Sequence, residues 1–234
     1  MTGKAALVFG ATGGIGSALS EALDADSRFD TVIRFSRSAA SPVPVDLASE
    51  ESIRDAARWV RDNHITPSMI FVATGLLHDD RCGPEKSLRQ LDADWLLKNY
   101  QVNAVGPALI AKYFLPLTDR KEMVKFAALS ARVGSISDNR LGGWYGYRAA
   151  KAALNMMIRN LSIEWTRRND RSVIVALHPG TVDTPLSEPF QANVPAGKLF
   201  DSSRAAQQLL AVLEALEPAQ SGRIFAWDGT EIQP

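Results

Sequence analysis

Short runs of apolar and β-branched residues alternate along the chain with longer amphipathic stretches. The short runs predict buried strands, and apolar positions with a helical period predict helices. Strands are expected over residues 5–9, 31–35, 69–73, 124–129, 173–177 and 224–227, with a further short strand that ends at Val45. Helices are expected over about 15–23, 49–64, 92–117, 145–168 and 202–216, the third bent at Pro107.

This alternation is typical of an α/β fold, in which helices cover a parallel sheet. No repeat, low-complexity tract or linker divides the sequence, so we expect a single domain over residues 1–234. A Pro-rich segment, at about 183–200, is expected to cover a ligand rather than to separate two domains.

Composition and charge narrow the possible functions. The 234 residues are 46% apolar, which is enough for one packed core, and 26 Lys and Arg balance 26 Asp and Glu. Zero net charge argues against a nucleic-acid partner. Residues 5–9, the longest apolar run near the N-terminus, are too short for a secretion signal or a membrane span, so a cytoplasmic protein is expected. Cys82 stands alone, and the three histidines lack metal-ligand spacing, so we expect no metal.

Two local patterns suggest chemistry. Gly10, Gly14 and Gly16 follow the first expected strand and open a helix, where backbone amides can hold a pyrophosphate. Such turns also occur as plain connections. Tyr147 and Lys151 lie four residues apart on one face of an expected helix. A phenol exchanges protons near neutral pH only beside a cation that favours the phenolate, although pairs at this spacing are common on protein surfaces.

Four features in order along the chain are similar to those of the short-chain dehydrogenase/reductase family: Gly10-xxx-Gly14-x-Gly16, Asn103 in the long middle helix, Tyr147-xxx-Lys151, and residues 179–184 after the sixth strand. Residues 134–139, the Tyr147-Arg148 pair and residues 221–229 resemble the C-factor and sniffer-like carbonyl reductase branch. The resemblance covers nearly the whole chain. It implies a Rossmann-like, three-layer fold with a doubly wound parallel sheet of about seven strands, which binds a nicotinamide cofactor and transfers hydride to or from a carbonyl carbon.

The resemblance also implies roles for individual residues. Tyr147 would be the acid/base, Lys151 would hold the nicotinamide ribose and lower the pKa of the tyrosine, and Asn103 would keep a water for proton relay. Cofactor contacts would come from Gly10, Thr12, Gly14, Ile15 and Gly16 at the pyrophosphate, Asp46 and Leu47 at the adenine, Gly75 at the ribose, and Pro179, Gly180, Thr181, Val182 and Thr184 at the nicotinamide.

Two positions depart from the family pattern. Ala131 stands where the family has a serine that holds the substrate carbonyl. Ser130 keeps the strand-end position and Ser135 precedes Tyr147 by twelve residues; we favour Ser135 as the hydroxyl donor. Ala73 replaces an asparagine after the fourth strand, which is expected to alter local support rather than chemistry.

The end of the second strand bears on cofactor choice. Ser36 stands where an acidic residue would favour NAD, and Arg37 follows it, with Arg34 and Ser38 nearby. Because a guanidinium matches a phosphate, NADP(H) is expected to be preferred, with NAD(H) still possible. Position 13, where many NADP-preferring relatives have a second basic residue, is a glycine in this chain, so this further support for NADP(H) is missing.

Aromatic residues near the expected site, namely Trp144, Tyr145, Phe190 and Phe200, could line a substrate pocket or belong to the core. The helices at 92–117 and 145–168 resemble those that pair between subunits in the family, which suggests a homodimer or homotetramer. An apolar stripe of Leu154, Met157, Leu161 and Trp165 agrees with this, but a core face would look the same.

Two functions follow from these observations. The first is an NADP(H)-dependent carbonyl reductase that acts on a small molecule. The alternative is a nucleotide-binding sensor or signalling protein of the same fold with little turnover, which the alanine at position 131 and the C-factor resemblance suggest.

Overall fold

A computed structural model describes residues 4–234, which form a six-stranded parallel sheet between two layers of helices. The strands are β1 (Ala5–Phe9), β2 (Thr31–Phe35), β3 (Pro67–Val72), β4 (Lys125–Leu129), β5 (Val173–His178) and β8 (Ile224–Ala226), in the order β2-β1-β3-β4-β5-β8. Phe9, the last residue of β1, lies opposite Phe35 of β2 and Val72 of β3, so the carboxyl ends of these three strands lie side by side. The chain reverses its direction of travel across the sheet between β1 and β3, and α/β proteins bind ligands at such a point.

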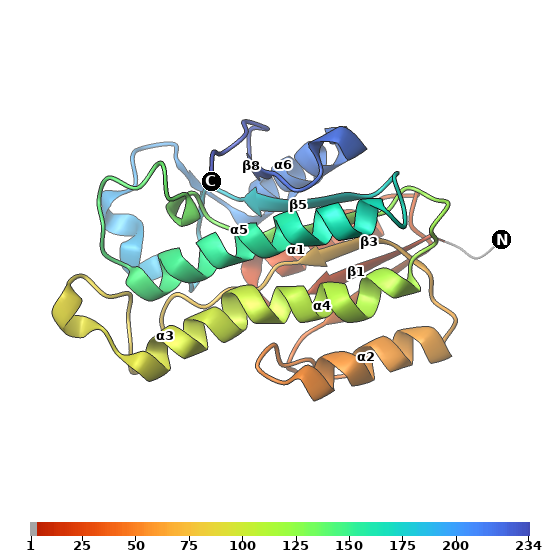
Figure 1. Ribbon diagram of the computed structural model, residues 1–234, viewed down its shortest axis with the longest axis horizontal. Coiled ribbons are helices and arrows are strands. Elements are labelled where there is room, and N and C mark those ends of the chain that lie inside the picture. The colour runs from red at the N-terminus through yellow and green to blue at the C-terminus, as the bar shows by residue number, and fades with distance from the viewer. Residues whose placement is uncertain (1–3) are drawn as a thin grey trace.

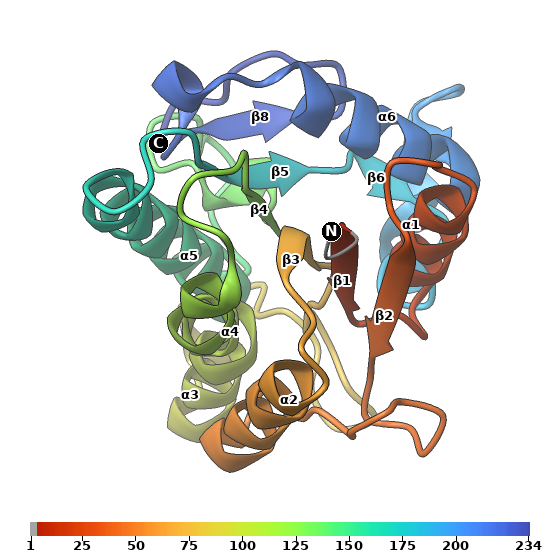
Figure 2. The ribbon, with the colours of Figure 1, turned by 90° about the vertical axis from the view of Figure 1, so that its right-hand side faces the viewer.

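Helices cover both faces of the sheet. Figure 2 shows α1 (Gly14–Asp24) and α6 (Ser202–Ala215) on one face and α2 (Glu50–Asp62), α3 (Ala93–Tyr100), α4 (Gly106–Phe114) and α5 (Tyr145–Thr166) on the other. Each face has its own apolar layer: Phe9, Phe35 and Phe114 pack together on the α2 to α5 side, and Leu19 and Leu209 pack on the α1 and α6 side. The predicted three-layer α/β fold is thus confirmed.

The predicted strand that ends at Val45 is wrong. Residues 43–45 have no strand structure, and the Val45 amide donates to the Ser36 carbonyl at 2.8 Å. Pro42 and Pro44 explain this, because proline lacks the N–H that a ladder requires. The main sheet therefore has six strands, and β6 (Thr181–Val182) and β7 (Leu199–Phe200) form a separate two-stranded sheet.

The long middle helix is interrupted slightly earlier than predicted. Residues Gln101–Val105 form a π-helical turn between α3 and α4, and Pro107 lies in the first turn of α4. Pro107 lacks the N–H that would meet the Asn103 carbonyl in an α-helix, which favours a local change of winding there. The interruption contains Asn103, one of the predicted site residues.

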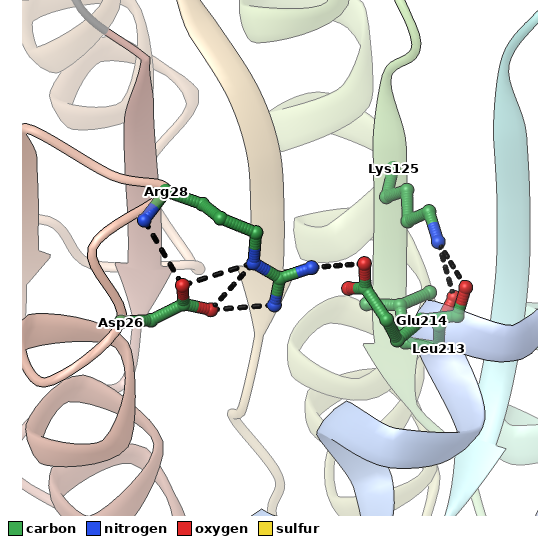
Figure 3. A network of polar contacts seen from close by, with 5 residues as sticks. All are labelled: Asp26, Arg28, Lys125, Leu213 and Glu214. Carbon is green, nitrogen blue, oxygen red and sulfur yellow. Dashed lines mark hydrogen bonds and ion pairs between the residues drawn. The ribbon is translucent and has the colours of Figure 1, made fainter.

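Polar contacts fix the end of α6 that lies away from the site. Lys125 of β4 is buried and donates its ammonium protons to the carbonyls of Leu213 and Glu214, at 2.8 and 2.7 Å. Arg28 joins Asp26 to Glu214, as Figure 3 shows. A cation at a helix C-terminus donates hydrogen bonds to the free carbonyls and is attracted to the negative end of the helix dipole, which stabilises the helix.

Candidate active site

The glycine turn lies at the carboxyl end of β1 and opens α1. Gly10 has φ +84°, which favours glycine. A Cβ on Gly16 would stand 2.1 Å from the Gly10 oxygen, so the turn closes only with glycine at position 16. No side chain caps α1, which leaves the N–H groups of its first turn free to bind a ligand. The buried hydroxyl of Thr74, beside Gly10, also has no hydrogen-bond partner among residues 4–234. Free amide donors beside an unpartnered hydroxyl fit a bound pyrophosphate.

Tyr147 and Lys151 are both buried in the first turns of α5, as their spacing predicted. The Lys151 ammonium donates to the Leu129 carbonyl at 2.7 Å and lies 5.6 Å from the centre of the tyrosine ring. Burial raises the pKa of Tyr147 and lowers the pKa of Lys151 to about 7. Burial is the cause of this rise, and the Lys151 ammonium lies over the ring and donates to a carbonyl; the lowering of the tyrosine pKa by Lys151 stays a prediction.

Asn103 is fully buried in the π-helical turn. Its side chain bonds the main chain of Leu76 twice, accepting from the amide at 3.0 Å and donating to the carbonyl at 2.7 Å. Gly75 lies next to it, since a Cβ there would be 3.7 Å from the Asn103 Oδ1. Asn103 thus ties the loop after β3 to the middle helix.

A cavity of about 480 Å³ lies at the carboxyl ends of β4 and β5, with Tyr147 in its wall. Most of the lining is apolar and comes from Ile15, Leu77, Val133, Leu141, Trp144, Leu186, Phe190 and Val194. Of the residues predicted to bind the cofactor, Ile15, Pro179, Gly180, Thr181, Val182 and Thr184 contribute to it. The Trp144 and Phe190 rings are 5.0 Å apart. Tyr145 is exposed and Phe200 packs against Trp227, so these two lie outside the lining.

The two candidate serines are placed differently. Ser130 and Ala131 both line the cavity, and the Ser130 hydroxyl donates to the Asn155 Oδ1 at 2.7 Å. Ser135 is buried outside the lining, where its hydroxyl accepts from the Asp138 amide at 3.1 Å. The structure therefore brings Ser130, and not the favoured Ser135, to the same cavity as Tyr147. Arg132 and Val133 of the 3-10 turn at Arg132–Gly134 still line the cavity, whereas Ser135, the next residue after the turn, does not, and sequence spacing does not reveal this.

The residues expected at the adenine and its ribose lie at the end of β2 and beyond. Arg37 is exposed and pairs with no carboxylate in the described part of the chain, whereas Arg34 forms an ion pair with Asp24. Leu47 is buried against Gly106, and Asp46 accepts from the Ala48 amide at 2.9 Å. Thr12 is exposed in the glycine turn.

Two residues near the cavity were missed by the sequence analysis. Glu85 is 2% exposed, and its carboxylate accepts from the Gly146 amide at 3.2 and 3.1 Å, which caps the start of α5. His178 lines the cavity with an unpartnered, buried Nδ1, and burial lowers its pKa to about 4, so it is neutral at pH 7. Within residues 4–234 no cluster of His, Cys, Asp or Glu could hold a metal ion, and no helix is long and apolar enough to cross a membrane.

Residues 11–229 match a family model described as enoyl-(acyl carrier protein) reductase, one of the models of short-chain dehydrogenases/reductases. The chain belongs to the short-chain dehydrogenase/reductase family. It is therefore an oxidoreductase of a family that acts on C=O or CH–OH groups.

Curated relatives agree with this assignment. C-signal of Myxococcus xanthus is 36% identical over 146 residues, covering 62% of this chain and 82% of the relative. A 1-hydroxy-2-glutathionyl-2-methyl-3-butene dehydrogenase of Rhodococcus sp. (strain AD45) is 31% identical over 189 residues, covering 81% of this chain and 78% of the relative.

Solved structures confirm the short-chain dehydrogenase/reductase fold. The NADPH-bound carbonyl reductase from chicken fatty liver superposes with a TM-score of 0.85 at 23% identity, over all of this chain and 95% of that one. The carbonyl reductase Sniffer of D. melanogaster gives 0.84 at 21% identity, over the whole of both chains.

Proposed function

We propose that the protein is an NADP(H)-dependent carbonyl reductase, reversibly an alcohol dehydrogenase, with Tyr147 as acid/base. One observation carries the proposal: Tyr147 is buried in the wall of an apolar cavity that also receives Ile15 from the glycine turn and Thr181 from the strand-end segment. This position supports a role for the phenol at a carbonyl group bound beside a nicotinamide.

The chain's own residues would divide the work. A bound nicotinamide would supply the hydride. The uncapped amides of α1 and the strand-end Thr181, Val182 and Thr184 would hold the cofactor. Lys151 would stay fixed beside Tyr147 by its bond to the Leu129 carbonyl, and Asn103 would hold the loop after β3 through Leu76. Because burial keeps the phenol protonated at neutral pH, Tyr147 can donate its proton to the alkoxide oxygen during reduction.

Ser130 is the better-placed hydroxyl for the carbonyl oxygen. It lines the cavity next to Ala131, whereas Ser135 does not. Its hydroxyl now donates to Asn155 and would have to turn toward a substrate. Residues 183–200, five of which line the cavity or its rim, would cover the bound substrate: Thr184, Leu186, Ser187, Phe190 and Val194.

The preference for NADP(H) is supported by Arg37. It is exposed at the end of β2 and unpaired with any acid in the described residues, so its guanidinium is available to a 2'-phosphate. Arg34, which lies near Arg37 in the sequence, forms an ion pair with Asp24, so its charge would attract the 2'-phosphate less. NAD(H) lacks this phosphate and would gain nothing from Arg37.

A homodimer or homotetramer is also proposed. Met156 and Ile163 lie seven residues apart on α5 and are 61% and 45% exposed, and Leu97 of the adjacent α3 is 66% exposed. Within the predicted stripe, Leu154 and Trp165 belong to the core instead. The exposed apolar positions are the ones a partner subunit would cover.

A second candidate is a nucleotide-binding signalling protein with little turnover. It is favoured by Ala131, which removes a hydroxyl from the cavity wall, and by the similarity to C-signal. Both functions require cofactor binding, but only the reductase requires turnover.

The experiment that separates them follows the absorbance of NADPH and NADH with a panel of aldehydes, ketones and quinones, with cofactor binding measured by calorimetry. Faster oxidation of NADPH than of NADH on at least one substrate is expected. Tight NADPH binding without turnover across the panel would favour the signalling protein.

A further inference from the structure

The charged residues of the cavity are predominantly basic. Arg132, Arg140 and Arg148 line it, against a single acid, Asp138. Across the whole chain 26 basic residues balance 26 acidic ones, so this excess is local. A cleft with apolar walls concentrates the field of such charges on whatever enters it.

Arg148 directly follows Tyr147 in α5 and is half-buried at the cavity. Its Nε donates to the Gly143 carbonyl at 3.1 Å and its Nη1 to the Val133 carbonyl at 3.2 Å. Both acceptors are neutral, and no carboxylate among residues 4–234 pairs with this guanidinium. Burial without a counter-ion is costly for a cation, and part of its N–H fork is left unused.

No other charged residue that lines the cavity neutralises the positive charge of Arg148. Asp138 is 3.3 Å from Arg132 and is therefore already paired. Arg140 donates only to the neighbouring Asn139 carbonyl, at 3.3 Å, within the described chain. His178 carries no charge at pH 7. Two arginines thus face the cavity with no acid to neutralise them.

We propose that the cavity binds a carbonyl substrate with an apolar body and a carboxylate, and that Arg148 holds this carboxylate, assisted by Arg140. The inference rests on the proposed reductase function and narrows its substrates. A guanidinium fork whose two carbonyl contacts hold it in place is suited to a carboxylate, because the planar donors match its two oxygens and little side-chain freedom is lost. The aromatic and aliphatic walls would enclose the rest of the molecule.

The test compares kcat/KM, with NADPH, for 4-carboxybenzaldehyde and for its methyl ester, which differ by one charge. The wild-type protein should favour the acid by about tenfold or more, the size of a charge-assisted hydrogen bond. Arg148→Met should bring the ratio close to one. Arg167→Met removes the same charge from the exposed end of α5, outside the cavity, and should keep the wild-type ratio.

Calorimetry with benzoate and benzamide gives a second readout that needs no turnover. Benzoate should bind more tightly, and Arg148→Met should remove the difference. Arg140→Gln, which loses one contact to its neighbour, replaces Arg148→Met if that variant does not fold, and should reduce the ratio and the difference. Equal rates for acid and ester, or equal binding of benzoate and benzamide, would overturn the carboxylate site. Benzoate binding that depends on Arg148, without turnover of either aldehyde or of any compound in the carbonyl panel, would instead retain the site and reject the reductase.

Discussion

Burial shifts the pKa values of Tyr147 and Lys151 more than the two side chains shift each other. Both are fully enclosed, so each disfavours its charged form: the phenol holds its proton more firmly and the ammonium loses its proton more readily. The spacing of the two residues was enough to predict that they share one site. Their pKa directions could not be predicted, because they depend on how deeply α5 is buried against β5 and the other elements around it.

The pKa of Lys151 predicts a pH dependence of stability. Its folded-state pKa is about 7 against an ordinary 10.5, so between these values the unfolded chain binds more protons. The free energy of unfolding should therefore rise with pH from 7 toward 10, by up to about 1.4 kcal/mol per unit. Urea unfolding of the ligand-free protein at several pH values measures it. Lys151→Met should flatten the slope, and an equal slope in both proteins would contradict the assignment.

Arg37 governs cofactor choice in this account. Arg37→Glu should lower the ratio of kcat/KM for NADPH over NADH by about tenfold or more, since an attraction to the 2'-phosphate becomes a repulsion. Arg34→Gln is the matched control, because Arg34 is bound to Asp24. A wild-type ratio of kcat/KM for NADPH over NADH in Arg37→Glu, or a change of this ratio in Arg34→Gln alone, would contradict the role of Arg37.

At the scale of elements, sequence patterns predicted most strands and helices correctly. The helix expected at about 49–64 is α2, and Ser49 caps it by accepting from the Ser52 amide at 3.2 Å. The strand ending at Val45 was wrong because an apolar residue between prolines does not make a ladder. Ser135 was favoured by its spacing from Tyr147, but it is buried outside the cavity lining, directly after the 3-10 turn at Arg132–Gly134.

The cap of α5 comes from a distant residue, which no local pattern reveals. Glu85 belongs to the loop after β3, and both its carboxylate oxygens receive the Gly146 amide. Its main-chain carbonyl also accepts from Trp144, the residue before α5, which has φ +52°. The loop thereby sets where the helix that carries Tyr147 begins.

Glu85→Ala should lower the free energy of unfolding by about 1–3 kcal/mol, because it leaves a buried N–H without an acceptor. Glu85→Gln keeps an amide oxygen and should lose less. Lys86→Ala, at the exposed neighbouring position, should be close to wild type in the same urea titration. A Glu85→Ala protein as stable as wild type would show that the cap contributes nothing.

At the scale of the whole molecule, the order of strands places the glycine turn and the ends of β3, β4 and β5 at one edge. Ile15, Tyr147 and Thr181, which lie on motifs far apart in the sequence, therefore line one cavity. The resemblance of these motifs, in this order, to the short-chain dehydrogenase/reductase family is what predicted it. The basic lining of the cavity was not predicted, because it depends on how the loop at 130–144 folds over Tyr147.

The exposed apolar residues of α3 and α5 predict association. Light scattering should give a mass at least twice the 25.5 kDa of the chain. Met156→Glu combined with Ile163→Glu should yield monomers, because a charge buried at an interface without a partner is costly. Leu141→Glu places the same charge at another exposed apolar position, 92% exposed, and should leave the mass unchanged. A wild-type monomer would reject the proposal.

Tyr147 is proposed to move the proton during carbonyl reduction, and the Tyr147→Phe variant measures that contribution. On a substrate that the wild-type protein reduces, the variant should lose about 10²–10⁴-fold in kcat, the usual contribution of a general acid. NADPH affinity by calorimetry should stay near wild type, since only the hydroxyl is removed. Turnover by Tyr147→Phe at the wild-type rate would contradict the account.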